Sequence, residues 1–361
     1  SGYFHVCYEG KTVLYLRLSF LHSRIPLQLE AEWEPRVFPE EKPEYRERLD
    51  QILYDMVCDL NACSREPVIL RYDHEVGGNT VIKPLTGRKE CGPSNGGVIA
   101  PVPGSRRGFA LGAGINPFYS TIDTYLMALN VVDEAIRNVV ACGADPDYVA
   151  LLDNFCWPDP VYNEKTNPDG RYKLAQLVRA ARGLYDAALG YGAPFISGKD
   201  SMKNDYMVGG HKVSVLPTIL VSAIGIVPDV TKCITTDFKI GGDIIYLIGE
   251  TQRHLGCSLY YRKYGGRSSV IPTVDPDKNM KAYRACFKAI NEGLLESCHD
   301  LSEGGLGIAF AESCIGGQIG ASIDLSLLIE RGELSPQEIL FSESSGRFLV
   351  TVRAENEEKF K

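Results

Sequence analysis

The amino-acid sequence predicts an α+β fold. Strand-like and helix-like patterns mix along the 361 residues, but they do not follow the strict strand–helix–strand repeat of a doubly wound parallel sheet. The length suits about two domains, and an apolar content of 44% is ordinary for a protein that buries real cores.

Residues 1–43 are predicted to be the tail of a preceding domain and a linker. Residues 11–19 have the composition of a strand, and residues 34–43 are rich in proline and charge, as linkers often are. Because the chain starts with Ser1 rather than Met and ends in a charged run, we expect a fragment of a longer polypeptide.

Residues 44–230 are predicted to form one domain. Apolar residues at helical spacing indicate helices over 46–62, 120–142 and 171–189. Apolar runs bounded by turn residues indicate strands at 97–100, 149–153, 194–197 and within 212–227. The strand at 149–153 ends on the carboxylate of Asp153.

Residues 231–361 are predicted to form a second domain, truncated at its end. The expected elements are a strand at 243–248, a helix at 278–296, a turn at 299–305 and a strand at 347–352. Ser335, Pro336 and Glu338 match a capping box with proline at the first helical position, which marks a further helix start.

The composition argues against several classes of function. A net charge of −8 is the wrong sign for a general nucleic-acid surface. No run approaches the roughly 18 apolar residues of a membrane span, and no signal peptide opens the chain. Eleven cysteines without a Cys-x-x-Cys pair fit reduced thiols. We therefore expect a cytoplasmic protein with no nucleic-acid partner and no membrane partner.

The segment 298–306 combines a carboxylate, a hydroxyl and paired glycines before an apolar helix. A helix N-terminus carries free N–H groups and suits phosphate, so Ser302, Gly304 and Gly305 are candidate nucleotide contacts. Asp300 could hold a hard cation such as Mg²⁺. An ordinary helix start with Ser302 as N-cap explains the same pattern, and both interpretations stay open from these residues alone.

Glu134 and Asn138 are four residues apart in a predicted helix, so they share one face. Both offer oxygen atoms to a hard metal ion. A solvated polar stripe on an amphipathic helix is the alternative, and without further evidence it is the better interpretation.

A polar turn, 197–202, directly follows a predicted strand. Gly198 would let the backbone approach a ligand, Lys199 supplies charge and Ser201 supplies a donor. The spacing from Gly192 and the presence of Asp200 exclude a P-loop. The alternative for this segment is a polar turn with an exposed lysine. Asp153, a candidate ligand contact at the end of its strand, could equally be a carboxylate that caps a loop.

Seven segments occur in one order that resembles the second half of the phosphoribosylformylglycinamidine synthases. These enzymes belong to the ATP-binding superfamily of aminoimidazole ribonucleotide synthetase. The segments are 72–76, 92–95, 133–138, 152–157, 197–202, 299–305 and 341–344, and they span about residues 70–350.

The resemblance implies an ATP-dependent carbon–nitrogen ligase of purine biosynthesis. Such enzymes convert formylglycinamide ribonucleotide and glutamine-derived ammonia to formylglycinamidine ribonucleotide through an iminophosphate. It implies a barrel-forming N-terminal domain and a larger C-terminal α/β domain around a nucleotide cleft. It also implies a first half that carries the catalytic histidine, and a glutaminase subunit or domain. We therefore expect this chain alone to be inactive, and to homodimerise through its exposed barrel surface.

The resemblance also assigns residues. Glu134, Asn138 and Asp300 match ligands of a structural nucleotide's Mg²⁺, and Asn95 stands where the family has an aspartate ligand. Ser302 matches a nucleotide contact. In the smaller superfamily members, Asp153 and Gly198 match ATP contacts and Ser201 a substrate contact, whereas Lys199 replaces an asparagine metal ligand and cannot bind Mg²⁺.

Two alternative functions remain from the sequence. One is another superfamily enzyme, similar to thiamine-monophosphate or selenophosphate kinases. The other is a non-catalytic half that binds ATP or ADP and serves as a scaffold.

Overall fold

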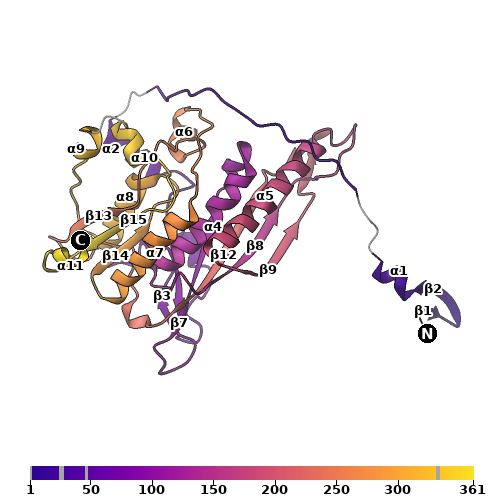
Figure 1. The fold of residues 1–361 in the computed structure, drawn as a ribbon, viewed down its shortest axis with the longest axis horizontal. Helices are drawn as coiled ribbons and strands as arrows, with labels where there is room; N and C mark the ends of the chain where they lie inside the picture. The colour runs from indigo at the N-terminus through magenta and orange to yellow at the C-terminus, as the bar shows by residue number, and fades with distance from the viewer. Residues whose placement is uncertain (1, 24–27, 45–47, 331–333) are drawn as a thin grey trace.

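The computed structural model describes residues 2–23, 28–44, 48–330 and 334–361. At the N-terminus, β1 (Tyr3–Tyr8) and β2 (Lys11–Arg17) form an antiparallel hairpin, followed by α1 (Leu18–His22). Figure 1 shows this unit standing away from the body of the molecule, and its apolar side chains are exposed on both strands. The strand expected at 11–19 therefore ends at Arg17, two residues early.

The segment before the first domain has little regular structure. Residues 28–44 run along the body with one isolated bridge, Glu41 to Arg267. The helix expected at 46–62 is shorter, because α2 spans Leu49–Val57 and a turn follows it. Residues 46 and 47 of that prediction lie outside the described residues. The short helix α3 (Glu66–Ile69) comes next.

The largest sheet of the described chain has the strand order β3-β6-β7-β12-β8-β9. Only β8 and β9 pair in parallel; the other neighbours are antiparallel. The strands predicted for residues 44–230 all belong to this sheet or to the small strand pairs beside it. The bounds are β3 (Thr80–Ile82), β6 (Gly96–Ile99), β7 (Gly108–Ile115), β8 (Val149–Cys156), β9 (Phe195–Ser201) and β12 (Thr218–Val227), with the small pairs β4 (Leu85–Thr86) and β5 (Gly92–Pro93), and β10 (Asp205–Val208) and β11 (His211–Ser214).

Two long helices, α4 (Thr124–Ala141) and α5 (Gly170–Tyr191), cover one face of this sheet (Figure 1). Asp123 caps α4 by accepting from the Tyr125 amide at 2.8 Å. Glycine is required at Gly114 of β7, since a Cβ there would lie 2.1 Å from the Val131 carbonyl of α4. This close approach brings α4 down onto β7 and places one side of the helix beside the strand.

A second sheet has the order β13-β15-β14. Its strands are β13 (Ile244–Ile248), β14 (Leu295–Asp300) and β15 (Phe348–Val352), and the helices that follow the first sheet are α6 (Leu259–Tyr264), α7 (Pro276–Asn291), α8 (Gly305–Gly317), α9 (Ser326–Glu330), α10 (Pro336–Phe341) and α11 (Glu357–Phe360). Single 3₁₀ turns lie at Pro117–Thr121, Val230–Lys232 and Ala354–Asn356.

The prediction of a helix over 278–296 is wrong at its C-terminal end. The helix α7 ends at Asn291, Gly293 takes a φ of +68°, and the chain then enters β14. His299 and Asp300 therefore end a strand instead of opening a turn. The capping box at Ser335 is confirmed, because its side chain and that of Glu338 each bond the other's backbone N–H.

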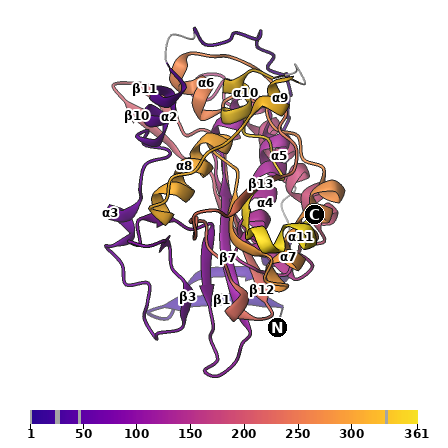
Figure 2. The same cartoon turned by 90° about the vertical axis from the view of Figure 1, so that its left-hand side faces the viewer.

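The two sheets share one core. Side chains of α4 and α7 and of strands from both sheets belong to a single buried apolar cluster. Figure 2, turned by 90°, shows α4 and α7 side by side, and α8 packs against the face of the second sheet opposite α7. Among the described residues, no helix is both long and apolar enough to cross a membrane.

Candidate functional site

A cavity of about 590 Å³ opens between α4, β7 and the turn before α8. Glu134 and Arg137 reach it from α4, and Ser302 and Glu303 from the turn. Residues 61–65 line another wall. The cavity thus lies between segments that are more than 160 residues apart in the sequence.

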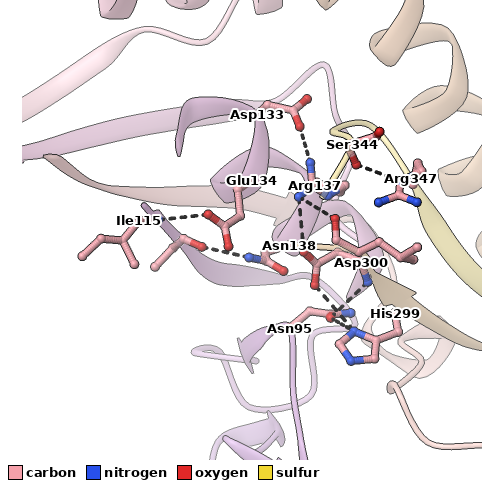
Figure 3. Close-up of polar contacts among 12 residues, drawn as sticks. Asn95, Ile115, Asp133, Glu134, Arg137, Asn138, His299, Asp300, Ser344 and Arg347 are labelled. Carbon is pink, nitrogen blue, oxygen red and sulfur yellow. Dashed lines mark hydrogen bonds and ion pairs between the residues drawn. The ribbon is translucent and has the colours of Figure 1, made fainter. Parts of the chain in front are cut away.

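Glu134 is held at the cavity wall by the backbone of β7. Its Oε2 accepts a hydrogen bond from the Ile115 amide at 3.0 Å (Figure 3). Burial, and then the negative charge of Asp300, raise the pKa of Glu134 to about 8. The Glu134 carboxyl is therefore mostly protonated at neutral pH when no cation lies beside it.

Asn138 is one turn further along the same helix face. Its Nδ2 donates to the Ala113 carbonyl at 2.8 Å. Its Oδ1 is buried and has no hydrogen-bond partner among the described residues. Since buried polar atoms nearly always have partners, this oxygen is available to a bound cation or to a water molecule.

Asp300 ends β14 and is 5% exposed. Its Oδ2 lies 3.4 Å from Arg137 and its Oδ1 3.5 Å from His299. Burial favours the neutral acid, but the His299 and Arg137 contacts outweigh it and hold the pKa of Asp300 below its usual range. Asp300 is therefore ionised beside the cavity.

The side chain of Asn95 is occupied by protein groups. Its Oδ1 accepts from His299 Nδ1 at 2.8 Å and from the Asp300 amide at 3.3 Å, and its Nδ2 donates to the Cys298 carbonyl at 3.0 Å. The other ring nitrogen of His299 lies 2.9 Å from Glu312. The geometry gives Asn95 a role in holding the end of β14.

The turn before α8 is built on positive φ angles. Gly304 is the N-cap residue with a φ of +78°, and no side chain caps the helix. The interpretation of Ser302 as N-cap is therefore wrong. The Gly304 amide donates to Glu343 at 2.9 Å and the Gly305 amide to the Ser302 carbonyl at 3.1 Å. The Ser302 side chain is left facing the cavity.

The second predicted group lies elsewhere on the first sheet. Asp153 of β8 pairs in register with Gly198 of β9, and a Cβ at Gly198 would lie 2.1 Å from Asp153 Oδ1. Burial raises the pKa of Asp153. Lys199 is exposed, and Ser201 donates to Asn204 at 3.1 Å. None of these four residues lines the cavity; of the first group only Glu134 and Ser302 do, with the others packed behind its wall. The strands β8 and β9 carry the second group and α4, β14 and the turn before α8 carry most of the first, so the sequence predicted two separate groups.

Sequence reasoning missed Arg137, Glu343 and Tyr119, which all line the cavity. Arg137 shares the helical face of Asp133, four residues earlier on α4, and that spacing of opposite charges is the signal that could have identified it. Glu343 could not have been assigned, because its partners, Gly304, Leu259 and Tyr119, are distant in sequence.

The candidate metal ligands mix carboxylates with an amide. No group of three or more histidine, cysteine, aspartate or glutamate side chains suited to a metal ion occurs within the described ranges. A cation site built here would therefore depend on Asn138 as well as on Glu134 and Asp300.

Comparison with known protein families gives two matches in sequence order. Residues 94–227 match "AIR synthase related protein, N-terminal domain" and residues 241–361 match "AIR synthase related protein, C-terminal domain". Together they cover more than half of the chain.

Curated relatives include "Phosphoribosylformylglycinamidine synthase subunit PurL" of Thermococcus sibiricus, 34% identical over 91% of this chain and 43% of the relative. The protein of the same name from Methanothrix thermoacetophila is 33% identical over 98% of this chain and 44% of its own length. The chain thus spans less than half the length of these relatives. The resemblance to the phosphoribosylformylglycinamidine synthases, inferred from seven sequence segments, is confirmed at the level of the family.

Solved structures agree at the level of the fold. "T. maritima PurL complexed with FGAR" superposes with a TM-score of 0.61 at 18% identity, over 87% of this chain and 47% of that one. "T. maritima PurL complexed with ATP" gives 0.55 at 19% identity, over 86% and 44%. The predicted mixed α+β class with its two family domains is confirmed.

Proposed function

Because the chain belongs to the AIR synthase related family, we propose that it is the second synthetase half of a phosphoribosylformylglycinamidine synthase, and that its cavity binds ADP or ATP with Mg²⁺. One observation carries the proposal. Figure 3 shows the half-buried Glu134 carboxyl and the buried Asp300 carboxylate close to Asn138, whose Oδ1 has no partner among the described residues.

The oxygen set fits a hard cation. Mg²⁺ takes oxygen ligands and is held by one or two carboxylates. Its positive charge would lower the pKa of Glu134, which burial raises, and so favour the ionised carboxylate. The ion would also give Asn138 Oδ1 a partner. Glu134, Asn138 and Asp300 would hold the ion, which would neutralise phosphate charge. Asn95, also a predicted ligand, would join them only by giving up its hydrogen bond with His299.

The turn and the cavity wall suit a nucleotide. The Ser302 hydroxyl at the cavity wall would bind a phosphate oxygen, with Gly304 and Gly305 shaping the turn that places it there. Apolar side chains on the wall would pack against a base: Ile69, Leu85, Ile308 and Ile315.

We assign the reaction to the whole protein rather than to this chain alone. ATP phosphorylates the amide oxygen of formylglycinamide ribonucleotide; ammonia then displaces phosphate, and the products are the amidine, ADP and phosphate. The first half would supply the catalytic histidine and a glutaminase the ammonia, in the cytoplasm. The names of the curated relatives and the FGAR complex of a neighbour support this. An assay of amidine formation by this chain alone should be blank.

The proposal also gives roles to the predicted residues on β8 and β9 and to the face of the first sheet opposite α4. Asp153, Gly198, Lys199 and Ser201 would contact substrate or nucleotide at the edge of the first sheet. Apolar side chains of the face opposite α4 are partly exposed: Leu111, Ile115, Leu152 and Ile226. This face would contact the first half of the synthetase in the full protein. When the first half is absent, it would contact a second copy of this chain, and sedimentation should then give the mass of a dimer.

Calorimetric titration with ADP tests the nucleotide site. Wild-type protein should bind ADP more tightly with Mg²⁺ than without it. Asp300→Asn should weaken Mg²⁺–ADP binding by about tenfold or more, because it removes a buried charge that the cation would pair with. Asp147→Asn is the matched control, since Asp147 pairs with Arg284 on the exposed surface.

Equal binding by wild type and Asp300→Asn would contradict the proposed site. Recovery of ADP from protein incubated with ATP would distinguish a working site from a non-catalytic one that only holds nucleotide.

A further inference from the structure

Asp133 lies beside the proposed nucleotide site without contacting the cavity. We propose that Asp133 is a positioning residue that fixes α7 and β14 against α4 and aims Arg137 at Asp300, an inference that rests on the proposed function of the cavity. The side chain is completely buried, at 0% exposure.

One carboxylate oxygen collects donors from two helices. Asp133 Oδ1 accepts from Tyr191 at 2.5 Å, Tyr283 at 2.5 Å and Asn279 at 2.8 Å. Tyr191 ends α5, whereas the other two belong to α7. Burial, and then the charge of Asp133, raise the pKa of both tyrosines, so their hydroxyls remain donors. The oxygen therefore ties α4 to α5 and α7.

The other carboxylate oxygen of Asp133 contacts Arg137, which lines the cavity. Asp133 Oδ2 forms an ion pair with Arg137 on the next turn of α4. Figure 3 shows the Arg137 guanidinium between Asp133 and Asp300. Arg137 donates to Asp300 Oδ2 at 3.4 Å and to the Leu301 carbonyl at 3.3 Å.

Arg137 is only partly used by these contacts. The residue lines the cavity although it is 3% exposed. Its Nε has no hydrogen-bond partner among the residues with described positions. A buried guanidinium with one spare donor lies where a phosphate oxygen or a bridging water would satisfy it. The position of Arg137 therefore affects both the cation ligand Asp300 and the anion in the cavity.

Geometry separates this role from simple packing. The two α7 residues that donate to Asp133 belong to the helix that directly precedes β14, the strand that ends on Asp300. Asp133 itself belongs to α4, the helix that also carries Glu134. A change in their hydrogen bonds would shift Asp300 relative to Glu134 without touching either side chain. The distance between two cation ligands would then depend on a network outside the cavity.

Tyr283→Phe tests the inference with a small change. The variant removes one hydrogen bond to Asp133 and no side chain of the cavity wall. Tyr246→Phe is the matched control, since Tyr246 donates to Glu357 at 2.7 Å on the outer strand β13 of the second sheet. Both proteins are compared well below their unfolding temperatures, so loss of folded protein does not enter the result.

The first readout is the ratio of ADP dissociation constants without and with Mg²⁺. We expect Tyr283→Phe to lower this ratio by about tenfold, as loss of a hydrogen bond to a charged group would, and Tyr246→Phe to leave it unchanged. A ratio unchanged in Tyr283→Phe, or lowered equally in both variants, would overturn the role in positioning Asp300.

The second readout needs no ligand. Amide hydrogen exchange at Asp300, Leu301 and Gly304 should be about tenfold faster in Tyr283→Phe than in Tyr246→Phe. If wild-type protein binds no ADP, the proposed function fails, and the positioning role stands or falls on exchange alone. Equal exchange in the two variants would overturn it.

Discussion

At the scale of single residues, Glu343 links the two walls of the cavity. Its Oε1 accepts from the Leu259 amide at 2.8 Å and the Gly304 amide at 2.9 Å, and its Oε2 accepts from the Tyr119 hydroxyl at 3.1 Å. Burial, and then the charge of Glu303, raise the pKa of Glu343 to about 7. The charge of Glu343 therefore changes near neutral pH, directly beneath the turn that carries Ser302.

Glu343→Gln should flatten the dependence of stability on pH. In the unfolded chain Glu343 ionises near the ordinary glutamate pKa of 4.5, but in the folded chain only near 7. The folded state therefore retains the proton between these values, and wild-type stability falls as pH rises from 4.5 to 7, by up to about 3 kcal/mol from this group. Glutamine cannot ionise and removes that loss.

Urea unfolding at several pH values measures the effect. Glu358→Gln is the control, because Glu358 is exposed on α11, and its curve should follow the wild type. A Glu343→Gln curve parallel to the wild type would contradict the raised pKa.

Residue-level prediction from the sequence succeeded where a local pattern carries the information. The four-residue spacing placed Glu134 and Asn138 on one face, and both indeed lie on the same side of α4, bonded to β7. Arg137 was not assigned, because its role depends on Asp300, 163 positions away. Whether these residues bind metal or nucleotide remains a prediction.

At the scale of elements, the start of α8 depends on a glycine that packing requires. Gly305 has a φ of +62°, and a Cβ there would lie 2.2 Å from the Ser342 carbonyl. Gly192, at the end of α5, has a φ of +65° but nothing within 4 Å of a Cβ. The two glycines share a backbone conformation and differ in their surroundings.

Alanine at these two glycines should therefore have unequal effects. Gly192→Ala should lower the free energy of unfolding by about 1 kcal/mol, the cost of a left-handed L-residue. Gly305→Ala should lose a further 1–3 kcal/mol or so, because backbone atoms must move. Urea unfolding measures both variants. Equal losses of unfolding free energy would show that the backbone of the turn before α8 moves aside without cost, which would contradict the prediction.

Element prediction failed at β14 for a physical reason. Five of its six residues are buried, so the strand lacks the alternation of apolar and polar residues that marks a half-exposed strand. The helix predicted over 278–296 therefore includes the first two residues of this strand, Leu295 and Glu296. The long helices α4 and α5 were predicted within four residues at each end, because their apolar spacing spans several turns.

At the scale of the whole molecule, the cavity joins two sheets through one core. The apolar cluster and the Asp133 contacts fix α4 against α7 and β14. The mixed fold class and the family domains were predictable from the sequence. The depth of the cavity was not, since it depends on how segments distant in sequence pack.

The most direct test of the account is a crystal structure of the chain with ADP and Mn²⁺, a cation with strong anomalous scattering that takes oxygen ligands as Mg²⁺ does. The account predicts an anomalous peak at coordination distance from Glu134, Asn138 and Asp300, with the diphosphate beside Ser302. A peak beside Asp153 and Gly198 with the cavity empty of nucleotide would contradict it.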